Sequence, residues 1–155
     1  MAYLIRAASS GDLPVLCELW YEHKTLLAGD PRFALSPTAR QDWMDAAVGW
    51  LARPDLRFAA AYDADNTPVA YCLTRIEPTP GMASRALGVI FDAAADSHNY
   101  HGGVMRDLVA DARKWLAAQQ IDQLTALVPR LATADQAFWR GLGASDWTQW
   151  LWLKS

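Results

Sequence analysis

Residues 90–109, IFDAAADSHNYHGGVMRDLV, combine residue types and spacing that could do chemistry. An apolar run ends in a loop that contains the adjacent glycines Gly102 and Gly103, and an amphipathic pattern follows at once. This order points the N-terminus of a helix, with unpaired N–H groups and a partial positive charge, at the end of a strand. Such a site suits a phosphate or pyrophosphate. The alternative is a glycine-flanked loop that binds nothing.

The elements that must position this segment follow from hydrophobic periodicity and turn residues. The expected strands cover residues 3–8, 56–62, 68–77, 85–95, 124–128 and 146–153. The expected helices cover residues 13–28, about 36–51, 103–119 and 133–142. The order β-α-α-β-β-β-α-β-α-β predicts an α/β fold with a mixed sheet (α+β). The strand–helix–strand unit over residues 86–128 requires two neighbouring parallel strands.

Length and composition indicate one globular domain over residues 1–155, with a net charge of −3. That charge leaves no excess of cations for non-specific nucleic-acid binding. No apolar run is long enough to cross a membrane, and the N-terminus lacks a signal-peptide pattern. Cys17 and Cys72 have neither metal-ligand nor disulfide spacing. Both are therefore expected to be buried free thiols in a cytoplasmic protein.

Two histidines, His98 and His101, lie in the loop before the glycines. Their spacing suits a metal ion only on a regular helix with a third ligand nearby, and no such cluster converges with them. They are expected to be solvated loop residues, and no metal site is expected. His101 could still contact a phosphate.

The order of elements and several motifs resemble the GCN5-related N-acetyltransferase (GNAT) superfamily over nearly the whole chain. The opening IRAASSGDLPVL is similar to the family's first strand and helix start, and QAFWRGLGASDW to its Phe-Tyr-x-x-Leu-Gly-Phe ending. The segment over residues 90–109 resembles the acetyl-CoA motif, with Gly103 on its first glycine and Asp92 and Asp96 at commonly acidic positions. The resemblance implies a GNAT-like acyltransferase fold and acetyl-CoA as the acyl donor.

The resemblance also implies which residues hold the donor. In the family, backbone N–H groups of the turn bind the CoA pyrophosphate, and a bulge splays two parallel strands so that the pantetheine arm pairs with the strand. The corresponding residues here are Ala93, Ala95, Tyr100, His101, Gly102, Gly103, Val104, Met105 and Arg106. The alanines could equally just end a strand against a packed helix. The motif is divergent, because Tyr100 replaces Arg or Gln and Met105 replaces a small residue.

Acetyl transfer to an amine requires a proton acceptor, since only the neutral amine attacks a thioester. Asp92 lies near the family's usual carboxylate region, and Glu77 ends the adjacent expected strand. These two residues are the candidate catalytic bases, although both could be charges at the edge of a sheet. Trp139 stands where the family often has a tyrosine that protonates the leaving thiolate, so water would take that role.

Tryptophans supply a further set of candidates. Trp43 and Trp50 lie on the second helix, which lines the acceptor pocket in the family, and they could shape an apolar or aromatic acceptor site. Core packing would place them on the same face. Trp150 and Trp152 share one face of the last expected strand, where a homodimer could form.

The sequence therefore predicts an N-acetyltransferase that moves an acetyl group from acetyl-CoA to a primary amine of a small molecule or peptide. Direct attack in a ternary complex is expected, with no nucleic acid or membrane as a partner. The departures at Tyr100, Met105 and Trp139 favour a second interpretation. In it, the chain is a catalytically degenerate protein of the same fold that senses CoA or serves as a protein-interaction module.

Overall fold

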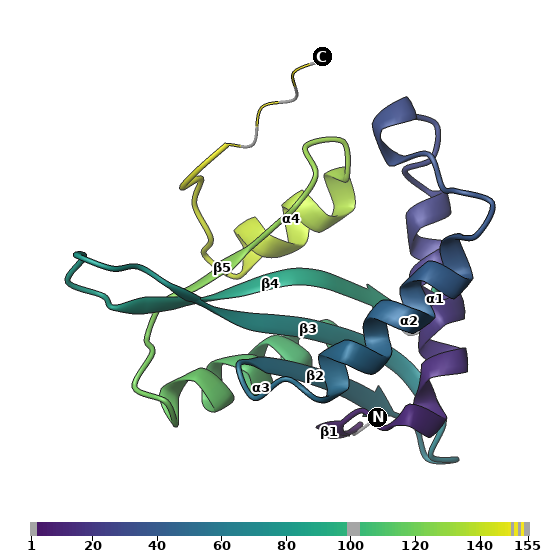
Figure 1. Ribbon diagram of the computed structural model, residues 1–155, viewed down its shortest axis with the longest axis horizontal. Coiled ribbons are helices and arrows are strands. Elements are labelled where there is room, and N and C mark those ends of the chain that lie inside the picture. The colour runs from purple at the N-terminus through teal and green to yellow at the C-terminus, as the bar shows by residue number, and fades with distance from the viewer. Residues whose placement is uncertain (1–2, 99–102, 150, 152, 154–155) are drawn as a thin grey trace.

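The computed structural model describes residues 3–98, 103–149, 151 and 153, and its elements follow the predicted order (Figure 1). The strands are β1 (Leu4–Ala7), β2 (Leu56–Tyr62), β3 (Pro68–Pro78), β4 (Ala86–Ala95) and β5 (Leu124–Ala126). The helices are α1 (Leu13–Thr25), α2 (Ala39–Leu51), α3 (Val104–Ala117) and α4 (Thr133–Gly141). Short 3-10 turns cover Ser10–Asp12 and Pro31–Phe33.

The five strands form one mixed sheet in the order β1-β2-β3-β4-β5. The first four pair antiparallel, as short connections between consecutive strands allow, and β4 pairs parallel with β5. α3 provides the crossover that a parallel pair requires. The mixed α/β fold and the parallel pair predicted from the sequence are confirmed.

Helices cover both faces of this sheet (Figure 1). α1 and α2 pack on one face, where the buried residues include Leu16, Trp43, Phe58, Tyr71 and Leu73. α3 packs on the other face through Val104, Leu108, Val109 and Ala112, and α4 adds partly buried residues there. The amphipathic pattern predicted for this helix is confirmed, with Met105 and Trp115 half-buried at its edges.

Polar contacts at its first turn fix α1 against β2. The Ser9 amide donates to Asp12 Oδ2 (2.8 Å), and the Tyr62 hydroxyl donates to the same oxygen (2.8 Å). Burial alone would raise the pKa of Asp12, but these hydrogen bonds hold it below its usual value. These contacts anchor the start of α1 to β2.

The strand expected over residues 146–153 is the one element that was predicted wrongly. Residues 144–149, 151 and 153 belong to no ladder, and this segment leads away from α4 (Figure 1). Trp147, Leu151 and Leu153 are exposed. The strand beside which this segment would have to pair is β5. Because β5 has only three residues in the sheet, it offers few backbone groups for pairing. Trp150 and Trp152 lie outside the described residues, and a homodimer through this segment stays a prediction.

Both cysteines are buried and free, as predicted. Burial raises the pKa of the Cys72 thiol to about 12 and also raises the pKa of Cys17. Over the described residues, no helix combines the length and apolar character that spanning a bilayer requires.

Candidate functional site

A β-bulge in β4 separates that strand from β5. Leu73 of β3 faces Asp92, whereas the next residue, Thr74, faces Ile90, so Phe91 is an extra residue in β4. The parallel ladder of β4 with β5 ends at Ile90. The two strands therefore stay paired up to the bulge and part beyond it.

The extra residue also changes which backbone groups face the gap. Before the bulge, the Ile90 carbonyl accepts a hydrogen bond from the Leu127 amide just after β5 (2.9 Å). Beyond it, the Asp96 amide donates to a carbonyl of β3 (2.8 Å). Since alternate residues of a strand direct their backbone groups to the same side, Ala93 and Ala95 direct theirs away from β3. Those groups face the side that β5 has left, where no described strand pairs with them.

α3 begins at the predicted phosphate site. Gly103 precedes the helix with φ = +79°, a left-handed conformation that glycine adopts without steric penalty. The Asp107 amide donates to the Gly103 carbonyl (3.1 Å), so the amides of Val104, Met105 and Arg106 precede the intrahelical hydrogen bonds. These three amides, together with the helix dipole, give this end of α3 the features that can bind an anion.

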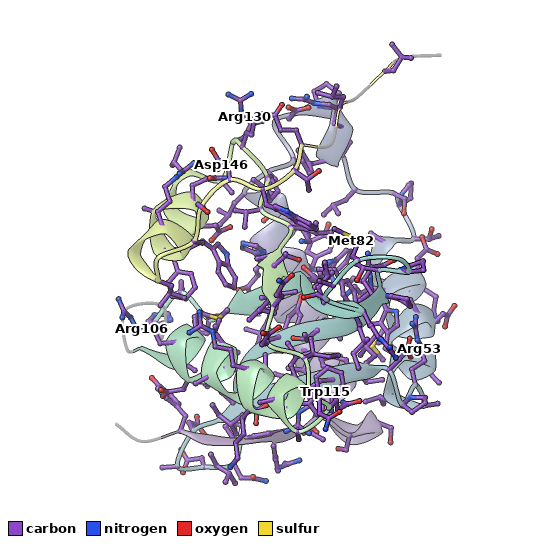
Figure 2. All side chains as sticks on the ribbon, turned by 90° about the vertical axis from the view of Figure 1, so that its left-hand side faces the viewer. Arg53, Met82, Arg106, Trp115, Arg130 and Asp146 are labelled. Atoms are coloured by element: carbon purple, nitrogen blue, oxygen red, sulfur yellow. The ribbon has the colours of Figure 1, made fainter. Side chains whose placement is uncertain are left out.

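The described side chains at this helix end leave its amides approachable. Among the described residues, no heavy atom outside the neighbouring residues lies within 4 Å of the place where a Gly103 Cβ would stand. Val104 is buried, and Met105 packs partly against the core on the α3 face, away from the helix axis. Arg106 is exposed at this end of α3, as Figure 2 shows. Tyr100, His101 and Gly102 lie outside the described residues, so their predicted contacts stay predictions.

Asp92 follows the bulge directly and lies on the α1 face of the sheet. Lys24 Nζ, from the last turn of α1, donates to Asp92 Oδ1 (2.7 Å), and the Tyr71 hydroxyl donates to Oδ2 (2.9 Å). The Asp92 side chain is 9% exposed and that of Lys24 is 26% exposed. Burial, reinforced by the nearby carboxylate, raises the pKa of Tyr71 well above its usual value, so its hydroxyl remains a donor.

Glu77, the other candidate base, lies elsewhere. It is opposite Leu87 near the far end of the β3–β4 pair, four residues along β3 from Leu73. At about 3.3 Å per residue this separation is roughly 13 Å, too long for both carboxylates to act on one proton. Its side chain is half-exposed and accepts a hydrogen bond from Arg75 Nε (3.1 Å). The structure does not bring Glu77 together with Asp92.

A second polar contact connects α1 with α4 beside the first. His23 Nε2 lies 3.3 Å from Asp135 Oδ2 in the first turn of α4. The other ring nitrogen, Nδ1, is buried and has no hydrogen-bond partner among the described residues. The neighbouring residues His23 and Lys24 thus connect the last turns of α1 to α4 and to β4.

The tryptophans proposed for an acceptor site belong mainly to the core. Trp43 is buried and contacts Tyr71 edge to face at 6.1 Å between ring centroids. Trp50 is half-buried and contacts the bulged Phe91 at 5.7 Å. Trp139 packs partly against the α3-face core beside Phe138, and an indole N–H cannot serve as the acid that a tyrosine would provide.

The sequence analysis missed Lys24 and Tyr71 as neighbours of Asp92. Lys24 has the pattern of an exposed cation near a helix C-terminus, and Tyr71 lies within an uninterrupted apolar run. Neither local pattern indicates a polar contact with a carboxylate 68 or 21 residues away. Only the crossing of α1 over the open part of β4 brings these groups together.

Several solved structures share this architecture over the whole chain. The BH1408 protein of Bacillus halodurans, in the form of a mutant, has a TM-score of 0.87 at 18% identity and covers 98% of this chain and 99% of its own. The aminoglycoside 6′-N-acetyltransferase AAC(6′)-Ig of Acinetobacter haemolyticus has a TM-score of 0.76 at 18% identity, covering 98% and 97%. A protein of Agrobacterium tumefaciens, named provisionally as an acetyltransferase, has a TM-score of 0.74 at 25% identity, covering 98% and 99%.

No family model and no curated protein sequence matches the chain. The structural similarity nevertheless confirms the resemblance drawn from the sequence, because these acetyltransferases are superimposable on this chain from end to end. The chain has the fold of the GCN5-related N-acetyltransferases.

Proposed function

We propose that this protein transfers an acetyl group from acetyl-CoA to a primary amine. The observation that supports this most strongly is the bulge at Phe91, which ends the pairing of β4 with β5 and leaves the backbone of Ala93 and Ala95 open. The open part of β4 then leads into an anion-binding helix end at α3. A ligand that combines an extended amide-containing arm with a pyrophosphate fits both features.

The described residues fit such a donor in a specific way. The N–H and C=O groups of Ala93 and Ala95 would pair with the amides of the pantetheine arm, as an added strand pairs with a sheet edge. The amides of Val104, Met105 and Arg106 would bind the pyrophosphate, and the exposed Arg106 side chain adds a cation at the same helix end. Tyr100, His101 and Gly102 complete the set proposed from the sequence.

The reaction does not require a covalent intermediate with the protein. An acyl thioester supplies an electrophilic carbonyl carbon and a good leaving group. The amine nitrogen bonds to that carbon as the C–S bond breaks, the ammonium proton leaves to a base, and the thiolate takes a proton from water. Positioning supplies much of the rate. Asp92 is the carboxylate at the point where β4 and β5 part, and we assign the proton-accepting role to it.

A second candidate function is a sensor or interaction module without catalysis. Two observations favour it: both oxygens of Asp92 already accept hydrogen bonds from Lys24 and Tyr71, and Trp139 provides no acid. The enzyme and the sensor share the donor site, so donor binding alone does not separate these two.

Calorimetric titration with acetyl-CoA, followed by a thiol-release assay over a panel of primary amines, separates these functions. The panel includes aminoglycosides, because several solved structures of this fold are named for aminoglycoside acetyltransfer. Binding with amine-dependent thiol release supports the enzyme. Binding without release over the panel supports the sensor. No binding at millimolar acetyl-CoA excludes the enzyme and the sensor and leaves the interaction module.

A matched pair of glycine variants tests the position of the donor site. Gly103→Trp is expected to abolish acetyl-CoA binding and leave the fold intact, because its side chain would project beside the α3 amides. Gly81→Trp is the control, since Gly81 also has a positive φ (+82°) and open space but lies in the β3–β4 hairpin. Equal acetyl-CoA affinity in the two variants would show that the donor binds elsewhere.

A further inference from the structure

The ammonium group of Lys24 is held by a largely buried carboxylate. Its Nζ lies 2.7 Å from Asp92 Oδ1, and the Tyr71 hydroxyl holds the other carboxylate oxygen at 2.9 Å. Tyr71 is fully buried and the Asp92 side chain is nine-tenths buried. A carboxylate that is fixed by a buried hydroxyl and shielded from water attracts an ammonium strongly and in one direction.

The position of this contact coincides with the proposed site of transfer. Asp92 is the first residue after the bulge, and it lies on the α1 face of the sheet, opposite the face covered by α3. An acceptor that attacks a thioester held along Ala93 and Ala95 must bring its nitrogen to this point of β4. In the structure, the nitrogen of Lys24 is already there.

We propose that Lys24 occupies the acceptor's ammonium subsite and must be displaced before an acceptor binds. This inference rests on the proposed function and specifies its acceptor: a primary ammonium on an unbranched aliphatic arm, the shape of a lysine side chain. Trp20 lies one helical turn before Lys24 and stacks on Trp43 at 5.9 Å between ring centroids, which gives such an arm an apolar wall. A quaternary ammonium has no N–H to donate to Asp92 and does not reproduce the contact.

Displacement is feasible because Lys24 is at the end of its element. α1 ends at Thr25, and turns follow until the 3-10 segment Pro31–Phe33. The Lys24 side chain is one-quarter exposed, whereas Asp92 and Tyr71 are held within the sheet. Asp92 and Tyr71 therefore stay in place within the sheet, whereas the Lys24 side chain can turn into solvent.

Chemical rescue of Lys24→Ala tests this proposal without acetyl-CoA. The variant leaves the Asp92 carboxylate without its cation, so its melting temperature is expected to fall below that of the unaltered protein. Added n-butylammonium chloride should raise that temperature in a saturable way, whereas tetramethylammonium chloride at equal concentration should not. Lys114→Ala, which removes an exposed lysine on α3, is the matched control and should show no selective rescue. Lys24→Ala combined with Asp92→Asn should also lose the rescue.

Equal stabilisation of Lys24→Ala by the two salts would overturn the proposal, because a site that accepts a cation without N–H donors does not recognise an ammonium group. Where Lys24→Ala does not fold, Lys24→Met with methylammonium provides the same comparison, since methionine retains most of the apolar stem.

A second readout separates this proposal from the proposed function. With acetyl-CoA present, n-butylamine should be acetylated by Lys24→Ala with kcat/KM about tenfold above that of the unaltered protein, as expected when a competing occupant fills the subsite nine-tenths of the time. Selective rescue without N-butylacetamide from either protein would retain the ammonium subsite and count against acetyl transfer. Product formation without selective rescue would retain the enzyme and overturn the role of Lys24.

Discussion

The two halves of β4 differ in how their backbone is used. The closed half, Gly88–Ile90, pairs with β3 on one side and with β5 on the other. The open half, Asp92–Ala95, pairs with β3 alone. One inserted residue, Phe91, separates a fully paired strand from a strand with a free edge.

One glycine lies in the closed half and another follows the open half, and the two positions require glycine for different physical reasons. A Cβ at Gly88 would lie 2.2 Å from Leu116 Cδ1, so the closed half needs glycine because α3 packs directly on the strand. Gly103, which follows the open half, has free space around it and a positive φ. A substitution at Gly88 is therefore expected to affect packing, and a substitution at Gly103 is expected to affect access of a ligand to α3.

Deletion of Phe91 should have the largest effect, because it removes the bulge. Phe91 and Asp92 both lie on the α1 face, so Asp92 would take the place of Phe91 on that face, and β4 would lose the local bend that parts it from β5. We expect kcat/KM for acetyl transfer to fall at least about 100-fold, as misplacement of reacting groups by an ångström can cause.

Phe91→Ala is the control for that deletion, since it removes the ring contact with Trp50 but retains the residue count. It should be less stable and keep measurable activity. Hydrogen exchange on the unaltered protein gives the same comparison without a variant: the amides of Ala93 and Ala95 should exchange faster than that of Ile90. Equal protection of these amides would mean that the gap beside β4 is closed.

Gly88→Ala should have the next largest effect, and only on stability. The new methyl group would push aside the buried Leu116 side chain, whose Cδ1 lies 2.2 Å from the position of the added Cβ. We expect the free energy of unfolding to fall by about 2–3 kcal/mol, measured by urea denaturation, at the upper end of the range for overpacked cores. Acetyl-CoA affinity should stay within twofold of the original, and a larger loss would contradict the separation of the two halves.

The sequence was sufficient for the framework because local patterns there agree with tertiary packing. The stripe of α3 could be predicted since Leu108, Val109 and Ala112 repeat at helical spacing and have a sheet face to cover. The parallel pair followed from the strand–helix–strand order. The glycine loop was found in the same way, because Gly103 immediately precedes an amphipathic helix.

The details of the site depend on contacts between distant segments, and these could not be predicted. A tryptophan in the core and a tryptophan that lines an acceptor site have the same spacing in the sequence. Only the packing of α2 on the sheet shows that Trp43 is buried. The pairing of Lys24 with Asp92 depends on the path of α1 over the sheet. The C-terminal alternation suggested a strand, yet a strand also needs a neighbour with free backbone groups in register.

Gly103→Ala should have a smaller effect on stability than Gly88→Ala and a larger effect on donor binding. An alanine at φ = +79° is strained by roughly 1 kcal/mol. To relieve that strain the backbone would rotate, which would redirect the amides of Val104 and Met105. We expect acetyl-CoA affinity to fall about tenfold, equivalent to about 1.4 kcal/mol, by calorimetric titration. Gly81→Ala, at a matching φ, should show the strain without the loss of affinity.

Cys72 should show the smallest effect, and it tests whether solvent passes the boundary between the two halves of β4. It lies in β3 opposite Ala93 of the open half, and its thiol is buried on the α3 face of the sheet. Its pKa is about 12 in the folded protein against 9.0 as the ordinary value, so the unfolded chain releases the thiol proton first as pH rises. Its contribution to stability is therefore complete below pH 9.0 and is lost as pH rises toward about 12.

Cys72→Ala should accordingly lose stability less steeply above pH 9.0, by up to about 1.4 kcal/mol per pH unit, in urea denaturation at successive pH values. At neutral pH the folded protein should react with an aromatic disulfide reagent far more slowly at Cys72 than the unfolded chain does. Rapid reaction at Cys72 in the native state would mean that solvent reaches through β4 to the α3 face. The opening beside Ala93 would then extend beyond the free strand edge that the bulge creates.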